Sequence, residues 1–474
     1  MNRVAAAAVL AVLGSPGAAI AQNYAALDPA LRPFVSVSEA VVALANVRVI
    51  DGTGAAAREN QTVLIENGRI TAVGPAAQVR VPAGARTLDL AGHTVIPGLV
   101  GMHNHTFYTT GRRSIQLQFS APRLYLASGV TTTRTTGGTS PYHEINMKRS
   151  IEGGTIAGPR MHLTGPYLTG PGGASTMAQV GSAEQARRIV AYWAEEGVTW
   201  FKAYTDISRE ALGAAIEEAH RRGLRFTGHL CSVSFREAVA LGIDNLEHGL
   251  FTNSDYTPGK QPDRCPGGMR ASLLNIAMDG PEVQQTIREM VDNGVAMTST
   301  LAVYELSFPD RPPLDPRMLD ALAPEAKEEY MATRQQITRQ AASSTMPELF
   351  RRAQAFERAF VQAGGLLGAG VDPTGNGGAL PGFGDQRNYE LLIEAGFSPV
   401  EAIRIMSFNG AKILGVDGEL GSIEAGKRAD LVVIRGNPVT SHGDIRNVTI
   451  VFKDGVGWDS AKLIESVKGV VGIR

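Results

Sequence analysis

The sequence predicts an α/β protein with a (β/α)8 barrel (TIM barrel) in its middle and a small β unit built from its two ends. Three observations lead to this prediction. Strand and helix patterns alternate through the middle of the chain, strand-like segments occur at both ends, and ionisable residues follow the ends of successive middle strands. Strand–helix alternation is typical of βαβ units and therefore of a parallel sheet.

Composition indicates a globular protein with a large core. The chain has 474 residues, of which 43% are hydrophobic and 19% charged, values typical of folded rather than disordered or fibrous proteins. The formal net charge is −1, from 45 basic and 46 acidic residues. Because no basic stripe stands out, nucleic acid and anionic membranes are poor candidate partners.

The N-terminus resembles a signal peptide. Arg3 supplies a positive charge, residues 4–13 are apolar, and residues 19–21 read Ala-Ile-Ala, a small-x-small cleavage pattern. The apolar run is shorter than the roughly 20 residues that span a bilayer, and a buried core helix is the alternative. We expect residues 1–21 to be removed and the mature protein to be periplasmic or secreted.

Both ends of the remaining chain are rich in strand patterns. Residues 41–50 and 61–73 carry alternating apolar side chains, and Asn67-Gly68 is a signal for a tight hairpin turn. Residues 429–435 and 448–453 repeat this character near the C-terminus. The expected division is a leader (1–21), the N-terminal part of the β unit (22–92), the barrel (93–415) and the C-terminal part of the β unit (416–474).

The middle of the chain contains eight predicted strands, counting the one that ends near His103. Helical patterns over residues 184–196, 209–222, 281–293 and 347–363 lie between many of them. Two long connections, residues 251–280 and 304–345, each follow a strand end, where they would shape or cover a pocket or simply extend the scaffold. The other seven strands are expected at Thr131–Thr135, Met161–Leu163, Trp200–Tyr204, Phe226–His229, Asn245–Leu250, Ala296–Leu301 and Leu366–Val371.

The first of these strands ends in a His-x-His pattern. Because side chains alternate along a strand, His103 and His105 project to the same face. Two neutral imidazoles that converge at a strand end can begin a metal site. Paired histidines also occur on ordinary surfaces, so the interpretation depends on further ligands at later strand ends.

Four more ionisable residues meet that condition. Lys202, His229, His248 and Asp372 lie in or at the ends of later predicted strands. In a barrel, all strand C-termini face one mouth, so these residues can meet. Each alone has an ordinary explanation, such as a packed core histidine, an ion-paired lysine or an aspartate that starts a turn. Their joint occurrence favours a metal site.

These motifs resemble the amidohydrolase superfamily, in the binuclear subgroup with a carboxylated lysine that includes exported dipeptidase- or prolidase-like enzymes and N-acyl-amino-acid amidohydrolases. The likeness covers nearly the whole mature chain and implies that the terminal β unit is a β-sandwich. The motifs are Pro97-Gly98-Leu99 before His103-x-His105, Phe201-Lys202-Ala203-Tyr204, Gly228-His229, Glu247-His248-Gly249, Gly370-Val371-Asp372, Ser407 to Lys412 and Gly418 to Val433.

The resemblance implies two divalent metal ions, zinc by default, with manganese, cobalt or nickel as alternatives. Cations about 3.5–4 Å apart require an anionic bridge, and the resemblance assigns it to a carbamate on Lys202. An unmodified lysine beside a one-metal site is the alternative. Asp372 would take a proton from a bridging water and pass it to the leaving nitrogen. The implied ligands are His103, His105 and Asp372 for one cation, and His229 and His248 for the other.

Three residues are candidates for substrate binding. Tyr204 shares a strand face with Lys202 and can donate to a carbonyl oxygen or an oxyanion, although packing against the next strand explains it equally well. Arg134 and His143 would bind a substrate carboxylate. The alternatives are that Arg134 braces the barrel interior and that His143 is an ordinary surface residue.

Two departures from relatives narrow the chemistry. His229 is followed by Leu-Cys-Ser rather than by the glutamate that family deaminases carry, which disfavours deamination. Residues 170–174 read Gly-Pro-Gly-Gly-Ala where many peptidase-like relatives have Gly-Gly-His, which places their substrate contacts in doubt. The two cysteines, Cys231 and Cys265, are too few for a disulfide framework; a buried thiol plus a loop thiol is favoured, with a bond as the alternative.

The predicted function is that of an exported binuclear metallohydrolase that cleaves an amide bond in a dipeptide or N-acyl amino acid, including xenobiotic amides. An esterase, lactonase or phosphotriesterase is the alternative within the same chemistry, and a non-catalytic binding protein is the alternative outside it. The expected partner is a small-molecule amide, with no nucleic acid and no membrane after removal of the leader. A homo-oligomer remains open.

Overall fold

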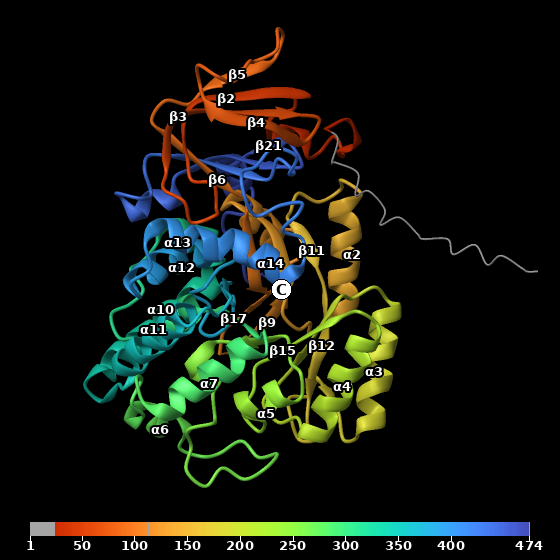
Figure 1. The fold of residues 1–474 in the computed structure, drawn as a ribbon, viewed down its shortest axis with the longest axis vertical. Coiled ribbons are helices and arrows are strands. Elements are labelled where there is room, and N and C mark those ends of the chain that lie inside the picture. Colours follow the sequence, from red (N-terminus) through yellow and green to blue (C-terminus); the bar gives the residue numbers. More distant parts are fainter. Residues whose placement is uncertain (1–23, 112, 474) are drawn as a thin grey trace, which may run out of the picture.

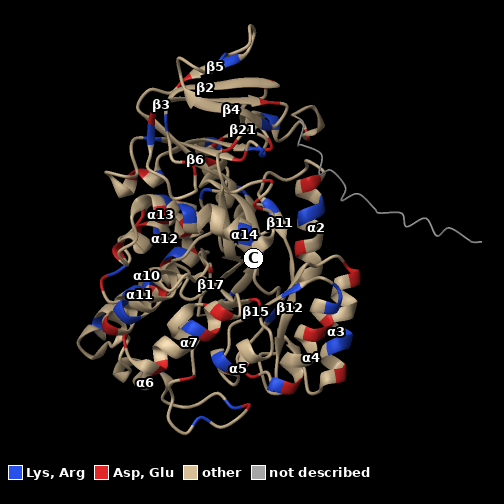
Figure 2. Ribbon diagram, viewed as in Figure 1, with Lys and Arg blue, Asp and Glu red and all other residues tan. Residues whose placement is uncertain are grey.

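The fold was analysed in a computed structural model that describes residues 24–111 and 113–473. The expected leader, residues 1–21, lies outside the described residues. Two large sheets organise this part of the chain, one above the other in Figure 1. Among the described helices, none has both the length and the apolar character needed to cross a bilayer. Both basic and acidic residues are scattered over the helices in Figure 2.

The upper sheet is mixed and combines strands from both ends of the chain, as predicted. β19 pairs antiparallel with β6, and β1 pairs antiparallel with β21. The expected Asn67-Gly68 hairpin joins β3 to β4, with both residues at positive φ. The nine strands are β1 (Val35–Val37), β2 (Val41–Val49), β3 (Arg58–Glu66), β4 (Arg69–Pro75), β5 (Arg86–Asp89), β6 (His93–Pro97), β19 (Leu431–Arg435), β20 (Val448–Lys453) and β21 (Val456–Asp459).

The lower sheet has ten strands, all paired parallel, in the order β11-β10-β7-β18-β17-β16-β15-β14-β12-β13. Near its ends, Gly138 forms an isolated parallel bridge with Pro166, so the segment after β10 lies beside β12. The strands are β7 (Leu99–Asn104), β10 (Val130–Thr135), β11 (Arg160–His162), β12 (Thr164–Thr169), β13 (Ala178–Gln179), β14 (Trp200–Ala203), β15 (Arg225–Gly228), β16 (Asn245–Glu247), β17 (Ala296–Ser299) and β18 (Leu367–Ala369).

Helices surround the parallel sheet (Figure 1), and the four expected from periodicity are α3, α4, α7 and α11. Ser182 and Ser208 cap α3 and α4 by accepting backbone N–H bonds. The helices are α1 (Ser120–Ala127), α2 (Pro141–Glu152), α3 (Ala183–Glu195), α4 (Arg209–Arg221), α5 (Phe235–Ala240), α6 (Met269–Asn275), α7 (Pro281–Asp292), α8 (Leu301–Glu305), α9 (Pro316–Ala321), α10 (Pro324–Arg339), α11 (Met346–Gln362), α12 (Phe383–Glu394), α13 (Pro399–Arg404), α14 (Gly410–Leu414) and α15 (Ser460–Glu465).

The sequence prediction missed one strand that matters for the site. Residues 161–163 were expected to supply the third strand, but β11 lies at the sheet edge beyond β10, and β12 pairs with β14 instead. β12 contains Gly165 and Pro166, residues that normally indicate a turn. Proline is tolerated here because Pro166 lies where the ladder is reduced to a single bridge.

The boundary expected at residue 92 also shifts. β6 extends the mixed sheet to Pro97, and β7 of the parallel sheet begins two residues later at Leu99. The chain passes directly between sheets because Gly98 fits against Thr131, where an added Cβ would lie 2.1 Å from the Thr131 hydroxyl oxygen.

Cys231 and Cys265 form a disulfide, with their Cα atoms 4.8 Å apart. The favoured expectation of two free thiols was therefore wrong. It failed because the cysteines are 34 positions apart in the chain, and only the return of the long connection after β16 toward the end of β15 brings them together.

The contact between β7 and β18 positions two of the expected ligands. The Asp372 N–H donates to the His103 carbonyl at 2.8 Å. A Cβ added at Gly370 would lie 2.1 Å from the backbone nitrogen of His103. Only glycine at this position lets the two strand ends approach so closely.

We therefore expect Gly370→Ala to force β18 away from β7, with a loss of about 1–3 kcal/mol in the free energy of unfolding and weaker metal binding. Chemical denaturation and elemental analysis would measure both effects. Gly418→Ala is the matched control, because a Cβ there meets nothing within 4 Å. Equal stability and metal content in the two variants would contradict this account.

Candidate metal centre

The ends of five parallel strands bring the six expected ligands into one buried group. His103 and His105 come from β7, and Asp372 follows β18. Ligand atoms of these three residues all lie within 4.8 Å of one another. His105 Nε2 is 3.4 Å from Asp372 Oδ1, and His103 Nε2 is 3.7 Å from Asp372 Oδ2.

The other three residues complete the cluster. Lys202 Nζ on β14 is 3.2 Å from His103 Nε2. The ring centroids of His229 and His248 are 4.4 Å apart, and those of His103 and His248 are 4.5 Å apart. Side chains that are up to 269 positions apart in the sequence thus converge at one end of the sheet.

His248 shows that the group suits a metal. Its Nδ1 is 2.7 Å from the Thr300 hydroxyl, whereas its Nε2 is buried and has no hydrogen-bond partner among the described residues. Buried polar atoms rarely remain unpaired. His248 and Asp372 also adopt positive φ angles of 68° and 46°, as do six Asn and Asp residues elsewhere in the described chain. A cation would account for the unpaired Nε2 of His248.

Burial keeps the histidines neutral, as metal ligation requires. It lowers the pKa of His105 to about 4 and that of His229 to about 3. For Asp372, burial alone would raise the pKa, but the neighbouring histidines outweigh it and lower the pKa well below the usual value. Three or more neutral imidazoles and a carboxylate form a typical donor set for zinc and related ions.

An ion pair lies directly beneath the cluster. Arg134 and Glu247 are both fully buried, and the guanidinium donates to Glu247 Oε1. Glu247 Oε2 is 2.7 Å from His103 Nδ1. Burial alone would raise the pKa of Glu247, but Arg134 and His103 lower it to about 2. The carboxylate therefore accepts the Nδ1 proton of His103 and leaves its Nε2 free to face the cluster.

A cavity of about 400 Å³ opens above the cluster. Tyr204 lines it, with its ring centroid 4.6 Å from that of His229, and burial raises the pKa of its phenol to about 12. The expected position of Tyr204 beside the ligands is therefore what the structure shows. The lining residues beyond the cluster are Phe107, Thr109, Ser114, Thr139, Tyr167, Thr176, Met177, Tyr204, Arg270, Val303, Tyr304, Ser307, Met346, Thr374 and Gly375.

The sequence reasoning missed Tyr167 and Arg270. The Tyr167 hydroxyl on β12 is 3.3 Å from His105 Nε2, and it was missed together with its strand. Arg270 on α6 belongs to the long connection after β16. The sequence predicted that this connection could shape a pocket, but it singled out no residue within it. A single arginine creates no periodic pattern in a sequence. The unusual length of the connection was therefore the one signal that this segment contributes to the site.

The structure places two proposed substrate contacts elsewhere. Arg134 braces the interior through Glu247 and the Met102 carbonyl and does not line the cavity, which matches the alternative stated above. His143 is half-buried on α2 and is also absent from the cavity lining. Their roles as carboxylate ligands therefore have no support in the geometry.

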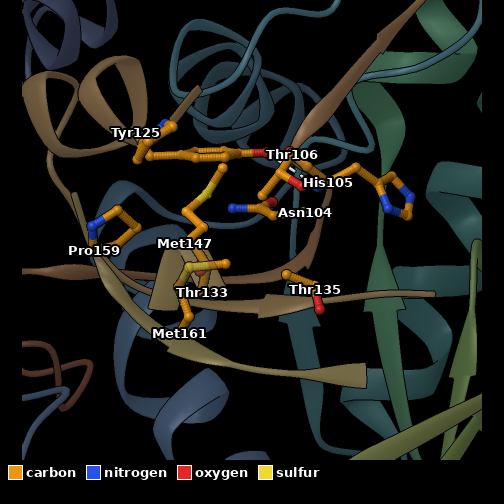
Figure 3. Close-up of a pocket in the computed structure, with 10 residues that line it drawn as sticks. Asn104, His105, Thr106, Tyr125, Thr133, Thr135, Met147, Pro159 and Met161 are labelled. Atoms are coloured by element: carbon orange, nitrogen blue, oxygen red, sulfur yellow. Dashed lines mark hydrogen bonds between the residues drawn. The ribbon is translucent and has the colours of Figure 1, made fainter. Parts of the chain in front are cut away.

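A second, much smaller cavity lies behind His105. Figure 3 shows it between Tyr125, Met147 and Met161, with the His105 ring pointing away from it. Its volume is about 10 Å³ and its lining is mostly apolar. The Tyr125 hydroxyl donates to the His105 carbonyl at 2.9 Å. This region therefore holds the backbone of His105 in place.

Glu144, next to His143 on α2, points inward. Its carboxyl group is buried, with Thr106 Oγ1 donating to Oε1 at 3.2 Å and no partner for Oε2 among the described residues. Burial raises its pKa to about 8. The folded protein therefore holds a proton there that the unfolded chain releases near pH 4.5.

We expect Glu247→Gln to leave Arg134 as an unpaired buried cation and to lower the free energy of unfolding by about 3 kcal/mol. The affinity for metal should fall about 10- to 100-fold because the orientation of His103 is lost. Denaturation and metal titration would measure these effects. Glu289→Gln breaks a partly exposed pair with Arg236 and serves as the control, with less than about 1 kcal/mol expected. Unchanged metal affinity in Glu247→Gln would refute the orienting role.

We also expect Glu144 to make a contribution to stability that falls as pH rises from about 5 to 8. The protonated Glu144 stabilises the fold fully below pH 4.5, and this contribution is lost as pH rises through its folded pKa. Glu144→Gln should flatten this pH dependence, whereas Glu152→Gln, exposed on the same helix, should retain it. Thermal melts between pH 5 and 9 test the prediction, and parallel curves for both variants would count against it.

Comparisons with known proteins agree with this fold. A candidate prolidase from Bifidobacterium longum is similar in structure, with a TM-score of 0.64, 25% identity and coverage of 90% of this chain and 98% of that chain. A Xaa-Pro dipeptidase with bound methionine gives a TM-score of 0.67 at 20% identity, covering 88% of this chain and 100% of the other.

Matches to curated sequences are local. The N-substituted formamide deformylase of Arthrobacter pascens is 44% identical over 63 residues, which is 13% of this chain and 11% of that protein. The chain aligns with no more than 25% of the length of the curated relatives it matches. The model of the amidohydrolase family, in contrast, matches residues 94–256 and 355–457, more than half of the chain. The chain therefore belongs to the amidohydrolase family.

Proposed function

We propose that the protein is a metal-dependent hydrolase that cleaves an amide bond in a dipeptide or an N-acyl amino acid. The observation that carries the proposal is the convergence of six ligand-type side chains, five of which line a cavity of about 400 Å³ (His103, His105, Lys202, His229 and Asp372). A cavity of this size is typical of small-molecule sites. We interpret the parallel sheet as the (β/α)8 barrel of the family, whose active sites lie at the C-terminal ends of the strands.

The donor set suits two divalent ions, for which zinc is the default choice. His103, His105 and Asp372 would hold one ion, and His229 and His248 the other. Lys202 Nζ lies 3.2 Å from His103 Nε2, and burial lowers the pKa of Lys202 to about 8. A neutral amine reacts with carbon dioxide, so the carbamate expected on Lys202 is consistent with this environment. When bound, the ions would supply a hydroxide nucleophile at neutral pH and polarise the scissile carbonyl.

The residues of the chain then have distinct tasks. Asp372 faces the cavity and contacts the ligand histidines, so its carboxylate is placed to accept a proton from water and deliver it to the leaving nitrogen. The Tyr204 phenol remains protonated, because burial raises its pKa to about 12. It can therefore donate a hydrogen bond to the developing oxyanion.

The proposed substrate class rests on the names of similar structures, and the proposed location rests on the N-terminal sequence. The names of the similar structures include a prolidase and a Xaa-Pro dipeptidase, which favours a short peptide or a related amide. The leader-like residues 1–21 favour export to the periplasm or beyond. Hydrolysis of esters, lactones or phosphotriesters on the same site is the outcome that a substrate panel has to separate from amide cleavage.

We expect Asp372→Asn to lower kcat on amides about 10²- to 10⁴-fold, because the variant has no carboxylate to carry the proton. Turnover of a panel of dipeptides and N-acyl amino acids by metal-loaded protein, with ester analogues that share one acyl group, measures the effect. Asp279→Asn, at an exposed position, is the control. Full activity in Asp372→Asn would refute the proton-transfer role, and turnover of esters alone would refute the amide assignment.

A further inference from the structure

We propose that Arg270 binds a carboxylate of the substrate and that the Cys231–Cys265 disulfide holds the segment carrying Arg270 over the cavity. The inference rests on the proposed function and specifies its substrate class. Such substrates carry a free carboxylate beyond the scissile bond, as N-acyl amino acids and dipeptides do.

Arg270 differs from the other residues that line the cavity. Outside the cluster of six ligands, it is the single lysine, arginine, aspartate or glutamate among the described lining residues. Its guanidinium forms no hydrogen bond or ion pair with any residue in the described part of the chain. Arg270 is exposed and lies at the rim of the cavity. An arginine there without a protein partner is available to bind an anion through two parallel hydrogen bonds.

An aromatic side chain, Tyr304, forms part of the cavity wall near Arg270. Tyr304 lines the same cavity and stacks on Phe251, with ring centroids 3.6 Å apart and an interplanar angle of 1°. Tyr304 also packs edge-on against His248, with ring centroids 5.5 Å apart. A carboxylate at Arg270 would therefore lie beside a fixed aromatic wall that leads to the metal ligands.

The disulfide connects the Arg270 segment to the ligand cluster. Cys231 follows ligand His229 by two residues, and Cys265 precedes Arg270 by five. Two ion pairs support the same segment, Arg209 with Asp263 and Lys260 with Glu237. These cross-links restrict the segment, so less ordering entropy is lost when a substrate binds.

Arg270→Gln is expected to raise KM for N-acetyl-L-leucine about tenfold and to leave KM for N-acetyl-L-leucinamide unchanged, since only the acid offers a carboxylate. Acetate release by zinc-loaded enzyme gives both constants. Arg264→Gln is the matched control, because Arg264 is exposed on the same segment and does not line the cavity. An equal effect of Arg270→Gln on acid and amide, or equal behaviour of the two variants, would overturn the assignment.

A binding measurement separates this inference from the proposed function. Calorimetric titration of zinc-loaded protein with L-leucine and L-leucinamide reports carboxylate recognition without turnover. If neither acetylated compound is hydrolysed, the proposed function fails for this substrate class, and the titration still decides the role of Arg270. Weaker binding of leucine alone in Arg270→Gln supports that role, and unchanged binding of leucine removes it.

A separate variant tests the role of the disulfide in carboxylate recognition. Replacing both cysteines, Cys231→Ser with Cys265→Ser, should reduce the preference for acid over amide to the level of Arg270→Gln. Adding Arg270→Gln to this variant should cause no further loss, because both changes act on the same contact. Zinc content and melting temperature confirm that the double variant is folded. A folded variant with full acid preference would refute the role of the disulfide.

Discussion

The buried chain of contacts from Arg134 through Glu247 to His103 is the interaction on which the rest of the site depends. It places one positive and one negative group in the interior, where neither is tolerated alone. Glu247 satisfies both neighbours, since it pairs with the guanidinium and accepts the Nδ1 proton of His103. The paired charges thus determine that Nε2 of His103, rather than Nδ1, faces the cluster of six side chains. Arg134 supports the centre from below.

Neutral groups orient other side chains of the cluster in the same manner. The Thr300 hydroxyl occupies Nδ1 of His248 and leaves Nε2 without a partner, and the Tyr125 hydroxyl bonds the backbone of His105. Each of these supports comes from a different strand or helix. The site therefore depends on the integrity of the whole parallel sheet. The close contact of Gly370 with His103 is one example, because a single added methyl group would force the strand that leads to Asp372 away from His103.

The cavity above the centre divides into two chemical zones. Its floor holds three of the histidines together with Lys202 and Asp372, which suit cations and the polar atoms of a scissile bond. Its rim carries Arg270 on a segment joined by the disulfide to the loop that follows His229. A substrate with an amide at one end and a carboxylate at the other matches both zones. The rim belongs to the long connection that follows β16.

The sequence alone predicted the six side chains that cluster and the division into two sheets. The ends of these strands could be predicted because alternation and burial impose local patterns on the sequence. The residues at these ends are His103, His105, Lys202, His229, His248 and Asp372. Tertiary structure decided what has no local pattern. β12 was hidden by Gly165 and Pro166, which signal a turn unless a sheet end accommodates them. The disulfide, the inward role of Arg134 and the exposure of Arg270 to the cavity depend on segments that meet only after folding, because their energies arise from partners far apart along the chain.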